Sequence, residues 1–246
     1  MENKITSAIV IRSTLFWSIV GLTAVPYTIL AISFVFVRIL GVRTRHRIIS
    51  SWGQVFTYLI RYLCKVDYTV TGLEHLINTP AIIASNHQSM WETIAFSTIF
   101  PQHVWILKHE ILKIPFFGWT IATLSPIAID RSRGSEAVQQ ILSQSVSRAE
   151  KGFSILVFPE GTRVKPGAKR VFKAGVAKMA KALNLPIIPV AHNAGYVLPK
   201  KSFWIYPGTV EIIIDKPLYP DEFDSAESLL EKLKNVVYHN LTAITH

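Results

Sequence analysis

Cysteine and acidic side chains are both scarce in this 246-residue sequence. Cys64 is the single cysteine, which excludes an internal disulfide and a metal site built from several cysteines. Asp and Glu number 16 against 26 Lys and Arg, so the formal net charge is +10 and an anionic partner is expected. Charged residues make up 17% of the chain, below the roughly 25% of a typical soluble domain. With 50% hydrophobic residues, the chain has enough apolar content for a large core and is not disordered.

Charge is absent from Ser13 to Val37, a run of 25 residues bounded by Arg12 and Arg38. At about 1.5 Å per helical residue, such a run can cross a bilayer core of roughly 30 Å. It is too long for the core of a signal peptide, and a buried core helix is seldom so long or so uniformly apolar. We therefore expect a membrane-anchoring helical segment. Pro26 leaves open a kinked span or a re-entrant hairpin.

Most of the positive charge lies next to this segment. Residues 1–65 carry eight Lys and Arg and one acidic residue, Glu2. Four arginines cluster between positions 38 and 47, and the positive-inside rule places the chain beyond them in the cytoplasm. Apolar residues then recur at helical spacing from Ile48 to Leu63, which predicts one amphipathic helix. This helix lies in the membrane interface or packs on the next domain, and its pattern does not separate the two.

From Val66 the pattern changes to short apolar runs that alternate with helical stretches. The alternation predicts an α/β domain over 66–246, with a largely parallel or mixed central sheet flanked by helices, after a membrane-anchoring region over 1–65. We expect an edge strand at 66–71, a late strand at 210–214 and a closing helix at 225–243. The other expected strands are 81–85, 104–107, 126–129, 155–158 and 187–191, and the clearest helices between them are 135–151 and 173–183.

Polar residues rich in His, Arg and Lys follow each of these five runs. Because the carboxyl ends of parallel strands meet at one edge of a sheet, where ligands bind, the pattern predicts one shared site. The general polarity of loops explains the polar residues but not the concentration of imidazoles and cations. The polar segments are 86–89, 108–110, 130–134, 159–163 and 192–195.

His87 and Glu92 are candidates for a general-base dyad. Five residues of one helix turn through about 500°, so the two side chains meet only if His87 lies in the turn before a helix and folds back over it. Ser89 is a good helix N-cap, which supports that turn. A carboxylate behind His87 would fix its tautomer and stabilise the imidazolium. Ser89 and Glu92 also match a capping box, in which Glu92 bonds the Ser89 amide.

No protein nucleophile stands beside this histidine in the sequence. There is no Gly-x-Ser-x-Gly elbow, and no second histidine has metal-ligand spacing from His87. A His–carboxylate pair of this kind suits direct transfer, in which the histidine deprotonates a substrate hydroxyl that attacks an activated acyl carbon.

Two further segments indicate a substrate that is both anionic and apolar. Arg163 can grip a phosphate through two hydrogen bonds, and Gly161 allows close backbone approach. From Gly161 through Val210 there are nine Lys and Arg and no acidic residue. Lys108 opens the other segment, and residues 114–129 after it are uncharged; they form core, a face that dips into the bilayer, or an acyl groove. We expect no nucleic-acid partner, since no nucleic-acid module is recognised and such a partner leaves the apolar segment unexplained.

The motifs together resemble those of the bacterial 1-acyl-sn-glycerol-3-phosphate acyltransferases, in the PlsC-like glycerolipid acyltransferase superfamily. The resemblance covers roughly residues 66–218, with the motifs in the family's order. The family's usual catalytic aspartate is a glutamate here, Glu92, which is one methylene longer. The matching segments are Asn86-His87-Gln88-Ser89 with Glu92 for N-H-x-x-x-x-D, Arg131 for the second motif, Phe158 to Arg163 for F-P-E-G-T-R, and Pro186 to Val190 for the apolar fourth motif.

The resemblance implies transfer of a fatty acyl group from acyl-CoA or acyl-carrier protein to the sn-2 hydroxyl of lysophosphatidic acid. His87 would be the general base and Glu92 would orient it, on the cytoplasmic face of the inner membrane. Membrane lipids, the lysophosphatidic acid and the acyl donor are the expected partners, and no cofactor or metal is expected because the thioester is already activated. The implied phosphate site is Lys108, Arg131, Glu160, Gly161, Thr162 and Arg163.

Two alternatives stay open at this point. The acceptor could be another lysophospholipid or a lyso-aminolipid. The chain could also be a non-catalytic, membrane-anchored lipid-binding protein, although the presence of both His87 and Glu92 argues against that.

Overall fold

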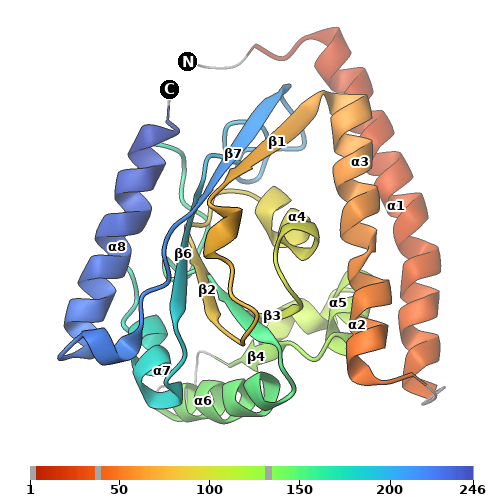
Figure 1. The fold of residues 1–246 in the computed structure, drawn as a ribbon. Coiled ribbons are helices and arrows are strands. Elements are labelled where there is room, and N and C mark those ends of the chain that lie inside the picture. Colours follow the sequence, from red (N-terminus) through yellow and green to blue (C-terminus); the bar gives the residue numbers. More distant parts are fainter. Residues whose placement is uncertain (1–3, 37–39, 131–134, 246) are drawn as a thin grey trace.

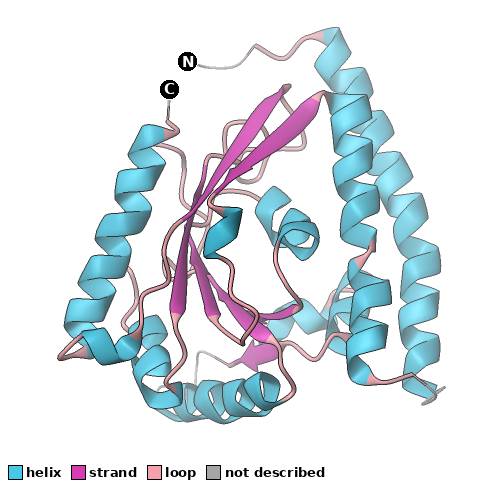
Figure 2. Ribbon diagram, in the orientation of Figure 1, coloured by secondary structure: helices cyan, strands magenta, loops and turns pink. Residues whose placement is uncertain are grey.

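A seven-stranded sheet lies at the centre of the molecule, which confirms the predicted α/β class (Figures 1 and 2). The structure is a computed structural model that describes residues 4–36, 40–130 and 135–245. Within these residues the strand order is β1-β7-β6-β2-β5-β3-β4. The strands are β1 (Val66–Thr71), β2 (Ile82–Ser85), β3 (His103–Lys108), β4 (Ile127–Ile129), β5 (Ser154–Val157), β6 (Ile187–His192) and β7 (Gly208–Ile214).

Five neighbouring strands, β6, β2, β5, β3 and β4, run parallel. β7 is antiparallel to β6, and β1 pairs with β7 at the edge of the sheet, as predicted for residues 66–71. β2 and β6 are buried along their whole length, which explains their uninterrupted apolar sequences. The carboxyl ends of the five parallel strands therefore share one edge of the sheet, as the sequence predicts.

Helices cover both faces of the sheet (Figure 1). Phe56 and Trp91 belong to the buried cluster on one face, and Met179 and Leu233 to the cluster on the other. On the first side lie α1 (Ser7–Phe36), α2 (Val42–Ser50), α3 (Trp52–Cys64), α4 (Trp91–Ile99) and α5 (Phe117–Thr123); on the second lie α6 (Ser135–Glu150), α7 (Gly175–Leu183) and α8 (Ala226–Ala243). Short 3-10 turns are η1 (Leu73–His75), η2 (His109–Lys113) and η4 (Pro220–Glu222).

The apolar N-terminal segment is one continuous helix, α1, with Pro26 inside it, so it is not a re-entrant hairpin. In the described part of the chain it is the one helix long and apolar enough to cross a membrane, over Ser7–Phe34 at a mean hydropathy of 1.8. Its inner face, with Phe16 fully buried, packs on the domain. Its outer face is open, with Leu22 exposed at 72%, so α1 is not a buried core helix.

The predicted single helix over 48–63 is wrong, because the chain forms two helices, α2 and α3, that meet at Ser51. At this junction the carbonyl of Ser50 accepts a hydrogen bond from Ser97 Oγ of α4 at 3.2 Å. Gly53 lies against the same hydroxyl, and a Cβ there would overlap it. Of the two alternatives for this segment, α3 therefore packs on the following domain (Figure 1).

Candidate active site

His87 and Glu92 meet at the start of α4. His87 Nδ1 lies 2.8 Å from Glu92 Oε1. His87 stands in the turn between β2 and α4, so its ring folds back over the helix as predicted. The carboxylate can only accept a hydrogen bond, so Nδ1 carries the proton and Nε2 keeps its lone pair. Among the described residues none bonds Nε2, and the His87 side chain is 15% exposed, so this nitrogen can serve as a base.

Glu92 Oε1 also accepts hydrogen bonds from the backbone N–H groups of Gln88, at 3.0 Å, and Ser89, at 2.7 Å. Glu92 therefore contacts the His87 ring and bonds the Ser89 amide, as in a capping box, at the same time. Burial by itself would raise the pKa of Glu92, but His192, His87 and the Ser89 N–H outweigh it and hold the pKa below its usual value. Glu92 is thus a buried carboxylate that stays charged.

Ser89 shapes the turn but is not the N-cap residue, a position held by Met90. Its hydroxyl oxygen accepts from the Trp91 N–H at 3.1 Å, and its hydrogen goes to the Leu198 carbonyl at 2.7 Å. With both functions occupied, Ser89 is not available as a nucleophile.

The segment after β5 lies against His87. The Phe158 ring stacks on the imidazole, with centroids 4.0 Å apart and planes 13° from parallel. The His87 carbonyl accepts from the Val164 N–H at 2.7 Å. Residues 158–164 therefore lie against His87, as expected for neighbouring strand ends.

A second histidine, His192, is joined to the turn through Asn86. The Asn86 side chain accepts from the His192 N–H and donates to the His192 carbonyl, both at 2.9 Å. The His192 ring donates from Nε2 to the Asn86 carbonyl at 2.9 Å and accepts at Nδ1 from the Ala194 N–H at 3.2 Å. Burial lowers the pKa of His192, which fits this neutral tautomer. These bonds clamp the end of β6 to the end of β2, and sequence reasoning did not select His192 for this.

Glu160 points at the backbone of His87 and is only 2% exposed. Its Oε2 accepts from the His87 N–H at 2.8 Å, and its Oε1 accepts from the Tyr238 hydroxyl at 3.2 Å. Burial raises the pKa of Glu160 to about 7. Gly161 follows at φ 69°, where a Cβ would lie 2.8 Å from Lys173 Cε. The geometry gives Glu160 a positioning role, and its implied part in binding phosphate stays a prediction.

The remaining cations lie around the same sheet edge. Thr162 and Arg163 are half-buried, and no described residue accepts a hydrogen bond from the Arg163 guanidinium. Lys108 is exposed at the carboxyl end of β3. Arg131 lies outside the described residues. Lys200 Nζ donates to the Arg163 carbonyl at 2.6 Å, which adds a further ammonium group beside this segment.

Comparison with known proteins places this site in a family. The chain matches the Acyltransferase family model over residues 67–193, which contain His87, Glu92 and Glu160. It is 38% identical over 212 residues to a 1-acyl-sn-glycerol-3-phosphate acyltransferase of Pseudomonas aeruginosa, an alignment that covers 86% of this chain and 82% of that protein. The chain belongs to the acyltransferase family.

Two more distant relatives extend the comparison of this acyltransferase. The chloroplastic 1-acyl-sn-glycerol-3-phosphate acyltransferase BAT2 of Brassica napus is 28% identical over 252 residues, covering 99% of this chain and 70% of that one. The crystal structure of the 1-acyl-sn-glycerophosphate acyltransferase PlsC from Thermotoga maritima shares the fold, with a TM-score of 0.78 at 24% identity over 96% of this chain and 97% of that one.

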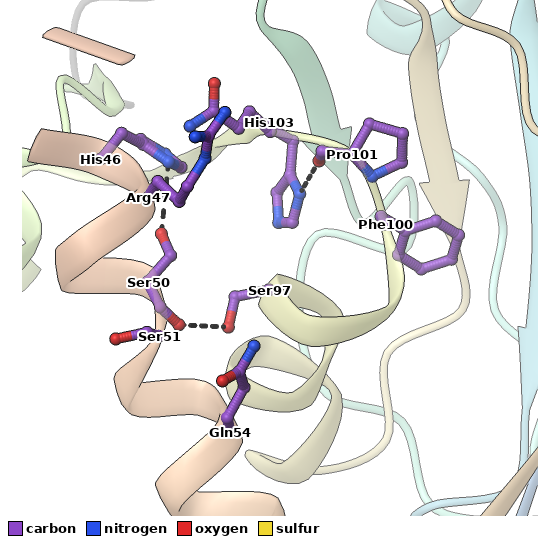
Figure 3. A pocket seen from close by; sticks show the side chains of 10 residues that line it. His46, Arg47, Ser50, Ser51, Gln54, Ser97, Phe100, Pro101 and His103 are labelled. Carbon is purple, nitrogen blue, oxygen red and sulfur yellow. Dashed lines mark hydrogen bonds between the residues drawn. The ribbon is translucent and has the colours of Figure 1, made fainter. Parts of the chain in front are cut away.

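Away from the dyad, the acyltransferase has a polar cavity of about 130 Å³ where α2, α3 and α4 meet the start of β3 (Figure 3). His46 and His103 line it, and burial lowers the pKa of each to about 4, so both imidazoles are neutral. Within the described ranges no three His, Cys, Asp or Glu residues lie close enough together to hold a metal ion.

Proposed function

We propose that this acyltransferase moves a fatty acyl group from acyl-CoA or acyl-carrier protein to the sn-2 hydroxyl of 1-acyl-sn-glycerol 3-phosphate, giving phosphatidic acid. The choice of acceptor rests on the names of the relatives, which are 1-acyl-sn-glycerol-3-phosphate acyltransferases. The observation that supports the mechanism most directly is the 2.8 Å contact between His87 Nδ1 and Glu92 Oε1, with Nε2 left free.

In the proposed reaction His87 Nε2 takes the hydroxyl proton while the alcohol oxygen attacks the thioester carbonyl carbon. The tetrahedral intermediate then collapses, the carbon–sulfur bond breaks, and the leaving thiolate takes the proton from the imidazolium. Glu92 stabilises the imidazolium between the two steps. The thioester supplies the activation, so we propose no cofactor and no metal.

For the phosphate of the acceptor we propose the groups at the carboxyl ends of β3, β4 and β5. The guanidinium of Arg163, to which no described residue offers a hydrogen-bond acceptor, suits a bidentate contact with two phosphate oxygens. Glu160 holds the turn that presents the phosphate ligands. The proposed ligands are Lys108, Arg131, the Gly161–Thr162 turn and Arg163.

The apolar helix α1 and the family together indicate association with a membrane. α1 lies beside α3 and α5, and Thr28 Oγ1 is 2.9 Å from Thr120 Oγ1 of α5. Because its inner face is covered by the domain, we propose that α1 lies along the membrane surface with its uncharged outer face in the lipid. We propose that the exposed rings of Phe116, at the start of α5, and Trp119, within α5, also enter the lipid. We propose that the site faces the cytoplasmic side of the inner membrane, where anionic lipid headgroups would attract the arginines that follow α1 in the sequence.

The test is acyl transfer by purified protein in detergent, with labelled acyl-CoA or acyl-carrier protein and a panel of lysolipids. Wild type should acylate lysophosphatidic acid. His87→Ala should lose transfer, and Glu92→Gln should lower kcat about a thousandfold or more, because the amide cannot hold the imidazolium. His239→Ala, which removes an exposed histidine on α8, should match wild type.

Three other outcomes of this assay would contradict parts of the proposal. Full activity in His87→Ala would overturn the dyad. Transfer to a different lysolipid alone would change the acceptor. Lipid binding without any transfer would show a non-catalytic protein.

A further inference from the structure

We propose that Tyr238, on the C-terminal helix α8, is a positioning residue for His87 and acts through Glu160. This inference rests on the proposed function, in which His87 is the base. Tyr238 lies outside residues 67–193, the range matched by the family model. It reaches the site only because α8 packs along the sheet on the face opposite α4 (Figure 1).

The link runs through the two oxygens of one buried carboxyl group. Glu160 Oε2 accepts from the His87 N–H at 2.8 Å, and Oε1 receives the Tyr238 hydroxyl at 3.2 Å. A carboxyl group held at both oxygens cannot rotate about its last torsion without breaking a bond. Tyr238 therefore sets the direction in which Glu160 holds the His87 backbone, while Glu92 holds the imidazole at Nδ1.

The same hydroxyl is anchored to the loop that follows the F-P-E-G-T-R segment. The Arg170 N–H donates to the Tyr238 oxygen at 2.8 Å, and the Arg170 carbonyl lies 2.6 Å from it as an acceptor. The ring packs on Phe172, with centroids 5.2 Å apart. Arg170 and Phe172 thus hold Tyr238 in place independently of its contact with Glu160, as a positioning group requires.

The link holds in either protonation state of Glu160. The hydroxyl has one hydrogen and two acceptors, Glu160 Oε1 and the Arg170 carbonyl. When Glu160 is charged, the hydrogen is shared between these acceptors. When Glu160 is protonated, its own O–H donates to the second lone pair of the tyrosine oxygen, and the tyrosine hydrogen goes to Arg170. Burial raises the pKa of Tyr238 to about 12, so its hydroxyl stays protonated throughout.

Tyr238→Phe tests the inference, because it keeps the ring on Phe172 and removes only the hydroxyl. We expect kcat to fall about tenfold, with the KM of both substrates within about twofold, since the hydroxyl acts on the base and not on substrate. In a Glu160→Ala background, which leaves no carboxyl group between the hydroxyl and His87, the same change should lower kcat by a clearly smaller factor than in wild type. The matched control is Tyr219→Phe, whose side chain is 45% exposed, and it should leave kcat and KM unchanged.

A second readout does not need activity. In protein labelled with ¹⁵N-histidine, the amide resonance that disappears in His87→Ala belongs to His87. Tyr238→Phe should shift that resonance in the direction that Glu160→Ala shifts it, and Tyr219→Phe should leave it in place.

Several results would overturn the role of Tyr238. These are an unmoved His87 resonance in Tyr238→Phe, a loss confined to the KM of the phosphate-bearing acceptor, or losses that add fully with those of Glu160→Ala. The acceptor-KM result would assign the hydroxyl to the Arg170 loop instead. If wild type transfers no acyl group, the proposed function fails, while the resonance still decides whether Tyr238 positions His87.

Discussion

At the scale of single residues, the side chain of Glu92, one methylene longer than the aspartate usual in the family, brings its carboxylate to three hydrogen-bond donors. Its Oε1 has three donors, the His87 ring and the Gln88 and Ser89 amides, at 2.7 to 3.0 Å. Three donors on one oxygen keep a fully buried carboxylate charged. His192 Nε2 lies 3.8 Å from the same oxygen, but its proton goes to the Asn86 carbonyl. The dyad therefore has one negative charge and one partly exposed imidazole that can reach substrate.

Glu160 should make stability depend on pH, and the sign follows from its raised pKa. Its pKa moves from 4.5 to about 7 on folding, so the folded state binds the proton more tightly. This contribution is complete below the unfolded pKa and is lost as pH rises through about 7. Glu160→Gln cannot titrate, so its stability relative to wild type should rise by up to about 3 kcal/mol between about pH 5 and about pH 8. Thermal unfolding in detergent at both pH values measures this, and a difference that stays constant with pH would contradict the raised pKa.

The contact between His87 and Glu92 could be predicted from sequence because the two residues are only five positions apart, one in the turn before α4 and the other in the first turn of that helix. The strand end before His87 and the helix start before Glu92 fix their meeting. His192 and Tyr238 could not be predicted in the same way. Their partners Asn86 and Glu160 lie 106 and 78 positions away in the chain, so only the packing of β6 and α8 brings them together.

At the scale of elements, the junction between α3 and α4 depends on a glycine. A Cβ at Gly53 would overlap Ser97 Oγ, which already bonds the Ser50 and Ile94 carbonyls. Gly53→Ala should therefore lower the free energy of unfolding by about 1 to 3 kcal/mol, despite the better helix propensity of alanine. Gly21→Ala is the control, because no atom lies within 4 Å of a Cβ there.

Thermal unfolding of the two variants decides the point. Gly21→Ala should equal or slightly exceed wild type. Equal stability of Gly53→Ala and Gly21→Ala would show that the helices do not pack as closely as the structure has them.

The junction between α2 and α3 also shows which features of the fold the sequence patterns could not predict. Uninterrupted apolar runs predicted β2, β5 and β6 well, because strands that are buried on both faces show their burial directly in their own sequence. The periodicity over 48–63 continues through Ser51, where one helix ends and the next begins. The Ser50 carbonyl at this break is bonded by Ser97, which lies 47 positions away, so this contact leaves no local signal in the sequence.

At the scale of the whole molecule, the charge and the apolar surface are separated. The exposed side of α1 from Ile11 to Ile29 carries no charge, whereas the loop after Glu160 carries exposed Lys165, Lys169 and Arg170. The proposed substrate would need both surfaces, since its acyl chain would stay in the bilayer while its phosphate would contact the cations. Membrane binding and catalysis should therefore be separable by substitution.

Leu22→Lys tests that separation, because Leu22 is the most open large side chain of α1, exposed at 72%. A lysine there should lower binding to phospholipid vesicles by at least about tenfold, since an apolar side chain no longer enters lipid and a charge must leave water. Val146→Lys is the control, an equally added charge at a 40% exposed position on α6, and it should bind as wild type does. Transfer to a short-chain, micelle-free acceptor should stay close to the wild-type rate in Leu22→Lys, because His87, Glu92 and Glu160 are untouched. Equal vesicle binding by the two lysine variants would show that the outer face of α1 is not the membrane contact. The remaining explanation would be attraction between anionic lipids and the arginines, and high salt should then abolish binding.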